Sequence, residues 1–210
     1  MRRFAVLALA LVALTALAAT PAAAQEGAAT VSAASADVLA HLERTRGLFL
    51  ASIDGLTAEQ WSWKPAPDRW SVAECAEHIT RSESFIRDLA RKSMSEPLPA
   101  EKLALSHGKS AQVLAMIVDR SQKAQAPEPL NPMKSGEMRS YAEILRDFNF
   151  ERGRTAELAA ASGDLEAFAT PHFVFQELDL AGWIYFLSGH SERHTLQIEE
   201  VKATAGFPQG

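Results

Sequence analysis

The sequence lacks several features that would place it in a familiar functional class. It has a single cysteine, Cys75, so no disulfide can form within the chain. It has no block of basic residues, and its 21 lysines and arginines are outnumbered by 26 aspartates and glutamates. No internal repeat, Gly-rich phosphate-binding loop or alternating strand pattern is present. The acidic balance argues against nucleic acids and anionic membrane surfaces as partners.

Only the N-terminus carries a long apolar run. Met1-Arg2-Arg3 is followed by an apolar stretch over 4–19 and by an A-x-A pattern over 22–24. This layout is typical of a secretory signal peptide and predicts cleavage after Ala24. No later stretch is apolar for long enough to span a bilayer. We therefore expect an exported protein, periplasmic or extracellular, with no membrane segment once residues 1–24 are removed.

Export has consequences for charge, size and redox state. Cleavage removes two arginines and no acidic residue, so the net charge changes from −5 to −7. About 185 residues remain, a length that suits one domain with a sizeable core. A lone thiol in an oxidising compartment is safest when buried, so Cys75 is predicted to lie in the core.

Four stretches show apolar residues at three- and four-residue steps, as amphipathic helices do. They begin near Val38, Ser71, Ser140 and Asp179. Two short sequences, Thr57-Ala-Glu-Gln60 and Ser71-Val-Ala-Glu74, have the capping-box pattern that opens a helix. A linker of small residues over 25–36 precedes the first helix, so a single domain is predicted over 37–207.

The connections between these helices are less regular. The chain from 95 to 139 joins the second and third helices, and within it only 110–124 is predicted to be helical. Residues 165–177 are predicted to form a loop before the last helix. Four main helices with a long crossing connection between the second and third predict an all-α four-helix bundle.

Two histidines stand on the inward face of the last predicted helix. His190 and His194 continue the apolar series formed by Leu187 and Ile198, so both are expected to point into the bundle. A buried polar group without a partner costs about 1–3 kcal/mol. The imidazoles are therefore either polar core residues with hydrogen-bond partners or ligands of a cation, and the H-x-x-x-H spacing alone is a weak metal signal.

His78 strengthens the metal hypothesis. It lies on the inward face of the second predicted helix, in a series with Cys75, Ser82 and Phe85. Helical bundles build metal sites where inward side chains of facing helices converge. Three imidazoles suit zinc, nickel or iron and leave coordination positions open for water or a small-molecule substrate. His78, His190 and His194 are therefore the predicted metal ligands.

The remaining histidines are weaker candidates. His41 and His107 have no partner at a useful spacing, and both are predicted to be solvated. His172 lies in the predicted loop before the last helix, from which it can reach the mouth of a pocket.

Three further residues are candidates for the pocket around a metal. Trp70 immediately precedes the helix that carries His78, so it is a candidate for the pocket wall. Glu74 is either an acid–base group or the capping partner of Ser71. Arg152 interrupts the apolar spacing of the third helix, so it either binds a substrate carboxylate or lies on a solvated face.

Two segments of the chain resemble a known family. "WSWKPAPDRWSVAECAEHITRSE" and "LAGWIYFLSGHSERHTLQIEEVKA" are similar to the signature segments of the DinB/YfiT-like metalloenzyme family, in its DinB-like domain subgroup. "RDFNFERGR" also resembles the third-helix segment of that family. The matching residues are Trp70-Ser71, His78, His190, His194 and Gln197-Ile198.

This resemblance implies a fold and a chemistry. The family has an up-down-down-up four-helix bundle, is often dimeric, and holds a divalent metal on three histidines. Its members include thiol-dependent S-transferases, a mycothiol-dependent maleylpyruvate isomerase and metal-dependent hydrolases. We therefore expect an exported metal-dependent enzyme of the hydrolase or S-transferase type. The resemblance also makes a homodimer an option for its assembly. The alternatives are a non-catalytic periplasmic metal- or ligand-binding bundle and a bundle whose histidines form a polar core.

Overall fold

The computed structural model describes residues 33–95, 99–121, 125–135 and 138–209. The predicted signal peptide, residues 1–24, lies outside this range, as does most of the predicted linker over 25–36. The first helix begins at Ala33, four residues before the predicted start of the domain. No helix of the described ranges is long and apolar enough to cross a membrane.

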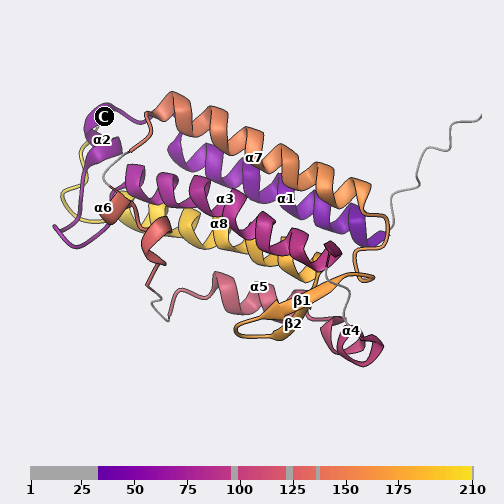
Figure 1. The fold of residues 1–210 in the computed structure, drawn as a ribbon. Helices are drawn as coiled ribbons and strands as arrows, with labels where there is room; N and C mark the ends of the chain where they lie inside the picture. Colours follow the sequence, from indigo (N-terminus) through magenta and orange to yellow (C-terminus); the bar gives the residue numbers. More distant parts are fainter. Residues whose placement is uncertain (1–32, 96–98, 122–124, 136–137, 210) are drawn as a thin grey trace, which may run out of the picture.

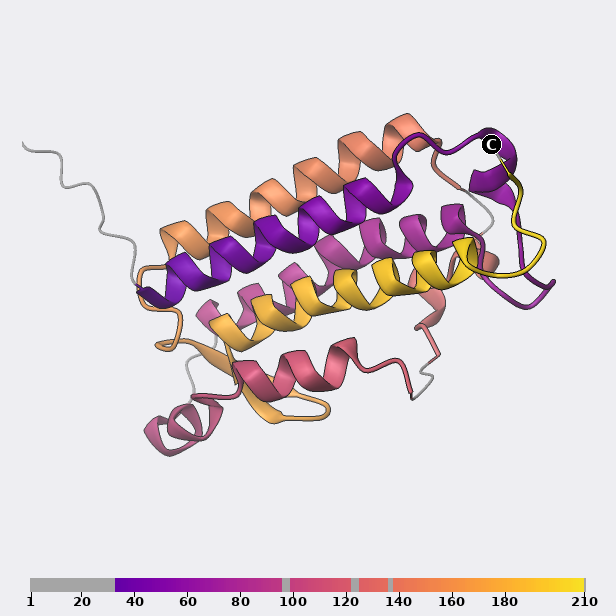
Figure 2. The same ribbon diagram turned by 180° about the vertical axis from the view of Figure 1, so that it is seen from behind.

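Four long helices form the body of the molecule, which confirms the all-α prediction. They are α1 (Ala33–Ile53), α3 (Val72–Ser95), α7 (Tyr141–Ala161) and α8 (Leu180–Lys202). Figures 1 and 2 show α1 beside α7 and α3 beside α8, so that the four helices make two layers. Helix α8 packs against both α3 and α1. Helix α3 also packs against α7, so the two layers meet along both pairs of helices.

Short elements surround the four helices. They are α2 (Ala58–Ser62), α4 (Ala100–Ser106), α5 (Ser110–Val118), the 3₁₀ helix η1 (Glu128–Leu130), α6 (Pro132–Ser135), and the strands β1 (Ala169–His172) and β2 (Gln176–Asp179). Helix α5 packs against α8 on the outside of the bundle, next to the β1–β2 hairpin (Figure 1). Helices α2 and α6 lie at the opposite end of the bundle from the hairpin and α4.

The helices begin where the capping patterns predict. Thr57 caps α2 in a complete capping box with Gln60, and Ser71 caps α3 with Glu74. Asp179 caps α8, where its carboxylate accepts a hydrogen bond of 2.6 Å from the backbone N–H of Gly182. Each cap satisfies backbone donors that the first helical turn leaves without a partner.

Three predictions about the connections are wrong in detail. The connection over 95–139, in which only 110–124 is predicted to be helical, also contains α4, η1 and α6. The helix predicted over 110–124 ends at Val118, because the Asp119 carboxylate accepts a 2.8 Å bond from the backbone N–H of Ser121 and so forms a turn. The predicted loop over 165–177 instead contains most of the antiparallel β1–β2 hairpin, with Ala169 opposite Asp179. Strands of four residues are too short to show a clear alternation of apolar and polar side chains.

The core consists of two hydrophobic clusters. One lies toward the hairpin end and contains Val38, Leu42, Ile86, Trp183 and Leu187 among others. The second includes Phe49, Cys75, Ile79, Phe148 and Ile198. Cys75 is fully buried, as predicted, and burial raises the pKa of its thiol far above the usual range. Its thiol is therefore protonated and unreactive.

A buried ion pair joins all four long helices. Arg152 of α7 is 2% exposed and donates two hydrogen bonds to the Glu83 carboxylate of α3, at 3.0 and 2.5 Å. It also donates to the hydroxyl groups of Thr45 on α1 and Ser191 on α8, at 2.7 and 2.9 Å. Arg152 therefore neither lines a pocket nor lies on a solvated face, and both predictions for it are wrong. Its charge is neutralised inside the bundle.

Replacing Arg152 should destabilise the protein severely. Arg152→Leu leaves the Glu83 carboxylate buried without a counter-ion, and breaking such a pair costs about 3–5 kcal/mol. We expect the free energy of unfolding in urea to fall by about this amount. The double variant Glu83→Leu/Arg152→Leu should regain a large part of the loss, since no lone charge remains buried. Equal stability of Arg152→Leu and wild type would contradict this account of the pair.

Helices α5 and α8 approach each other closely at Gly189. A Cβ atom at Gly189 would lie 2.5 Å from Cγ2 of Ile117 and 3.2 Å from Cδ2 of Leu114. Because Ile117 is β-branched, its methyl group cannot move aside without moving the side chain or the helix. The absence of a side chain at position 189 therefore sets the distance between α5 and the turn of α8 that carries His190.

Gly189→Ala should destabilise the protein although alanine favours helices. Overpacking costs about 1–3 kcal/mol, whereas the gain in helix propensity is about 1 kcal/mol. We expect a net loss of about 1 kcal/mol in the free energy of unfolding. Ile117→Ala, which removes the clashing methyl group, should make Gly189→Ala neutral or stabilising in that background. A stabilised Gly189→Ala single variant would show that α5 moves away without cost.

Candidate metal site

The three histidines predicted as ligands come together in the structure. His78 projects from α3, and His190 and His194 project from successive turns of α8. One ring nitrogen of each lies within 4.8 Å of those of the other two. The ring centroids are 4.4 Å apart for His78 and His194, and 4.6 Å apart for His190 and His194. Phe85, predicted on the same face of α3, is 43% exposed and takes no part.

Hydrogen bonds determine which nitrogen of two of these rings carries the proton. Nδ1 of His78 lies 2.8 Å from the carbonyl oxygen of Leu130 in η1, and Nδ1 of His194 lies 2.9 Å from Oε1 of Gln197. An oxygen of either kind can only accept, so Nδ1 carries the proton in both rings. The lone pair is then on Nε2, which is the arrangement that metal-binding histidines require.

The electrostatic environment keeps all three imidazoles neutral. Burial lowers the pKa of His78, and the hydrogen bond to Leu130 opposes only part of this effect. Burial, followed by the proximity of the other rings, holds the pKa values of His190 and His194 well below their usual range. Neutral imidazole is the form that binds a metal, so no proton has to be displaced at neutral pH.

The contact between His78 and His190 is the observation that best fits a cation. Their Nε2 atoms lie 3.2 Å apart. Nitrogen ligands about 2.0–2.1 Å from a tetrahedral zinc are separated by about 3.4 Å, so this spacing suits two ligands of one ion. Since His78 presents a lone pair on Nε2, a proton or a cation must lie between the two nitrogens. Nδ1 of His190 is buried without a hydrogen-bond partner among the described residues.

Trp70, a candidate for the pocket wall, lies against the histidine cluster. Its ring centroid is 4.9 Å from that of His78 and 5.8 Å from that of His194. Trp70 precedes the cap residue Ser71, so the capping box of α3 holds it in place beside the site. An indole in this position keeps water from one side of the cluster.

The carboxylates closest to His78 in the sequence are engaged elsewhere. Glu74 accepts 2.8 Å bonds from the backbone N–H of Ser71 and from Nζ of Lys64, which confirms its capping role. Glu77 is fully buried and forms ion pairs with Arg81 and Arg139. Neither carboxylate is among the groups that can hold the ion. The cluster is therefore purely of imidazoles.

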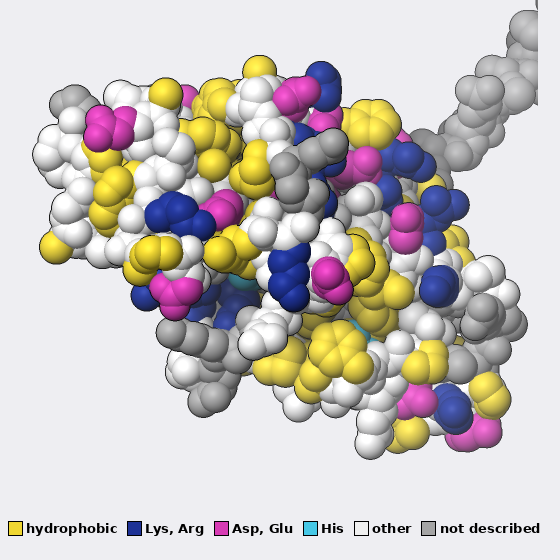
Figure 3. Space-filling view, turned by 60° about the vertical axis from the view of Figure 1, so that its left-hand side comes forward, with side chains coloured by type: hydrophobic (Ala, Val, Ile, Leu, Met, Phe, Trp, Pro, Cys, Tyr) yellow, Lys and Arg dark blue, Asp and Glu magenta, His cyan; other side chains and the backbone are white. Residues whose placement is uncertain are grey.

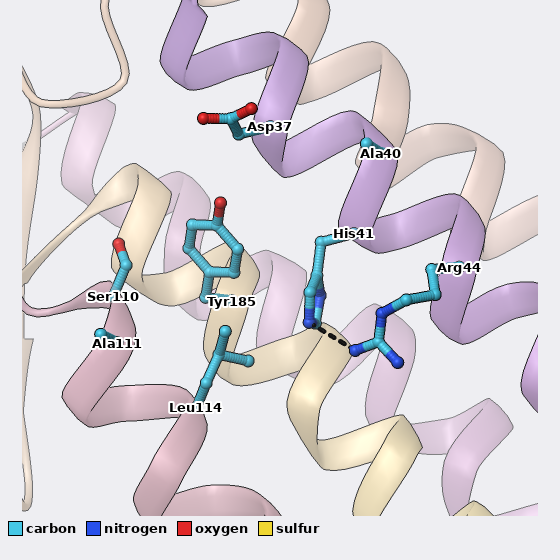
Figure 4. A pocket seen from close by; sticks show the side chains of 8 residues that line it. All are labelled: Asp37, Ala40, His41, Arg44, Ser110, Ala111, Leu114 and Tyr185. Carbon is cyan, nitrogen blue, oxygen red and sulfur yellow. Dashed lines mark hydrogen bonds between the residues drawn. The ribbon is translucent and has the colours of Figure 1, made fainter.

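His41 is not solvated, so that prediction is wrong. Its Nδ1–H donates to Oγ of Ser188 at 2.8 Å, and its Nε2 accepts from Arg44 at the same distance. Arg44 in turn pairs with both oxygens of Glu192, at 3.0 and 2.7 Å. Figure 4 shows His41 and Arg44 in an open groove between α1, α5 and α8, with Tyr185 beside them. The groove contains none of the three clustered histidines.

The other two histidines are also apart from the cluster. His107 is exposed, as predicted, and its Nε2 lies 3.1 Å from the carbonyl oxygen of Glu166. His172 is 5% exposed and packs among aromatic rings, with centroids 4.8 Å from Trp183 and 4.9 Å from Phe186. It therefore belongs to the core of the hairpin rather than to the mouth of a pocket.

The pKa of His172 predicts a pH dependence of stability. Its Nδ1 accepts from the backbone N–H groups of Val174 and Phe175, so protonation would place a proton against two donors. Burial lowers this pKa from 6.5 to about 4. The unfolded chain therefore binds the proton first as the pH falls, and stability is lost between pH 6.5 and 4.

A comparison with His172→Asn isolates this contribution, because asparagine keeps an acceptor near the position of Nδ1 and does not titrate. The free energy of unfolding of wild type relative to the variant should fall by up to about 3 kcal/mol from pH 7 to pH 4. Asp179, whose pKa burial raises to about 6, titrates in both proteins and cancels in the difference. Parallel pH profiles of the two proteins would contradict the prediction.

Two partners of the histidines were not identified from the sequence. Gln197 lies three residues after His194, so the helical spacing carries the signal that the two side chains share a face. The carbonyl group of Leu130 belongs to a proline-rich segment without a periodic pattern, and nothing in the sequence places it against His78. Figure 3 shows that only small patches of histidine are visible on this face of the molecule, among hydrophobic and charged side chains.

Comparisons with known proteins find a family whose model spans the candidate site. The family model of the DinB superfamily matches residues 41–198, a range that contains all three histidines. The chain is also similar to the uncharacterized protein YuaE of Bacillus subtilis (strain 168), with 26% identity over 151 residues, which cover 71% of this chain and 88% of that protein. No solved structure matches the chain significantly.

Proposed function

The chain belongs to the DinB superfamily, and from this membership and the histidine cluster we propose that it is an exported metal-dependent enzyme. His78, His190 and His194 hold one divalent ion, which is zinc, nickel or iron. The observation that carries the proposal is the convergence of three neutral imidazoles, each with a ring nitrogen within 4.8 Å of those of the other two.

The residues of the chain are arranged to bind and shield an ion. Leu130 and Gln197 accept the Nδ1 protons of His78 and His194, which keeps both Nε2 lone pairs available. Trp70 covers one side of the cluster and excludes water there. Three protein ligands leave coordination positions open, so a bound ion supplies Lewis acidity to a water molecule or to a substrate thiol or carbonyl group.

The reaction that we propose is hydrolysis or thiol S-transfer on a small electrophilic substrate. Glu74 and Glu77, the carboxylates adjacent to His78 in the sequence, are held in a helix cap and in ion pairs. This observation favours a second candidate, a metal- or ligand-binding protein without catalysis. Turnover measurements with metal-loaded and metal-free protein distinguish the two candidates.

Export is the second part of the proposal. It rests on the basic start, apolar run and A-x-A pattern of residues 1–24. Mass spectrometry of the protein recovered from the periplasm or medium of the producing cell should give a chain that begins at Gln25. Recovery of the chain in the cytoplasm with Met1 retained would contradict this part and leave the metal site untouched.

Removing one ligand should abolish metal binding. Protein purified without a nickel column should contain about one equivalent of zinc, nickel or iron, whereas His190→Ala should retain little, since one of three ligands is lost. His41→Ala is the matched control, because His41 is also a half-buried imidazole bonded to α8 but lies outside the cluster. Elemental analysis of the three proteins provides the measurement.

The metal contents of these three proteins also test the proposed site. Equal metal in wild type and His190→Ala, or little metal in wild type, would refute the three-histidine site. If wild type holds metal, a panel of esters, amides and electrophiles with thiol donors then tests for turnover. Metal-dependent turnover supports the enzyme, and tight metal binding without turnover supports the binding protein.

A further inference from the structure

The connection between α5 and α6 is tied to the turns of α8 that carry the histidines. Arg120 in this connection donates to both carboxylate oxygens of Glu200 through Nε and Nη2, each at 2.6 Å. In the other direction, Arg193 of α8 donates to the carbonyl oxygens of Ile117, at 3.2 Å, and of Asp119. Bidentate pairing orients the guanidinium group of Arg120 as a rigid plane.

The third nitrogen of Arg120 reaches the residue that holds His194. Nη1 donates to Oε1 of Gln197 at 3.4 Å, and the same oxygen accepts the Nδ1 proton of His194 at 2.9 Å. A chain of hydrogen bonds therefore runs from Glu200 through Arg120 and Gln197 to the imidazole. The side chain of Arg120 is 21% exposed, so the chain lies at the edge of the molecule.

The polarity of this chain matters because an amide side chain has two possible orientations. If Gln197 presented its NH₂ group, Nδ1 of His194 would have to accept, and the proton would move to Nε2. An imidazole with Nε2 protonated has no lone pair there and cannot bind a metal through that atom. Arginine can only donate, and Nη1 of Arg120 lies 3.4 Å from the oxygen of Gln197 and 3.5 Å from the carbonyl oxygen of Arg193. The guanidinium group therefore favours the orientation in which the oxygen of Gln197 faces it.

We propose that Arg120 is a positioning residue of the metal site, which orients the Gln197 amide and thereby the tautomer of His194. This inference rests on the proposed metal site. It assigns a role to a residue that lies outside the four-helix bundle, just after α5, where the helix predicted over 110–124 gives way to a turn. It also explains why the α5–α6 connection is held against α8 by arginines from both sides.

The first test compares metal affinity. Arg120→Met keeps the aliphatic stem and removes every donor, so affinity for zinc should fall by about 10–100-fold in competition with a chromophoric chelator. Arg44→Met is the matched control, because Arg44 forms the same kind of bidentate pair with Glu192 of α8 and touches no clustered histidine. Its zinc affinity should equal that of wild type. Urea unfolding of each metal-free variant checks that it is folded.

The second test uses a side chain that cannot be misoriented. A carboxylate only accepts, so Gln197→Glu presents an oxygen to His194 whether or not Arg120 is present. Its added charge also raises zinc affinity, and more where Arg120 is absent to pair with the carboxylate, so the tautomer decides. In the double variant, His194 should again be protonated on Nδ1 alone, and most of the lost zinc affinity should return.

A third measurement needs no metal. The ¹⁵N chemical shifts of the imidazole nitrogens report which nitrogen carries the proton. In metal-free wild type, His194 should be protonated on Nδ1, and in Arg120→Met it should populate both tautomers. Unchanged zinc affinity and an unchanged tautomer in Arg120→Met would overturn the role of Arg120 while leaving the metal site in place. A wild type that binds no zinc would overturn the proposed function itself.

Discussion

The buried pair of Arg152 and Glu83 is the constraint on which the rest of the structure depends. Its hydrogen bonds reach Thr45 on α1 and Ser191 on α8, so a single network joins all four long helices. A buried charge tolerates no loss of partners, because removing one costs several kcal/mol. The network therefore fixes the rotation of each helix about its axis. Ser191 directly follows His190, so the direction in which α8 presents its histidines is set by the same network.

Hydrophobic packing alone would not define this arrangement so closely. The two apolar clusters of the core contain residues of α1, α3 and α8, and interchangeable aliphatic contacts allow neighbouring helices to slide or rotate. The polar groups have only one arrangement in which all of their bonds are made. Gly189 adds a second restraint on the outer side of α8, where it sets the distance to α5. The histidines thus lie on a helix that is held on both sides.

Much of the candidate site could be predicted because it obeys helical spacing. Residues 187, 190, 194 and 198 share a face in any α-helix, and the capping box at Ser71 and the N-cap at Asp179 define where the two histidine-bearing helices begin. The position of Arg152 could not be predicted, because helical spacing does not identify the partner of a single charged residue. The same spacing is compatible with a pocket, with solvent and with a buried carboxylate. The prediction that His41 is solvated is wrong for the same reason, since its partners Ser188 and Glu192 lie about 150 residues further along the chain.

By itself, the sequence determined the helices, the faces that they bury and the three imidazoles on those faces, because these follow from local backbone geometry and hydrophobic periodicity. Only the tertiary structure decided which protons these imidazoles carry and which residues hold them in place. Leu130, Arg120 and Gln197 act through hydrogen bonds, whose direction depends on donors and acceptors brought together from separate segments. Helical spacing encodes the contact of Gln197 with His194, whereas no periodic pattern encodes the contacts of Leu130 and Arg120, since these are made between the connection and the bundle.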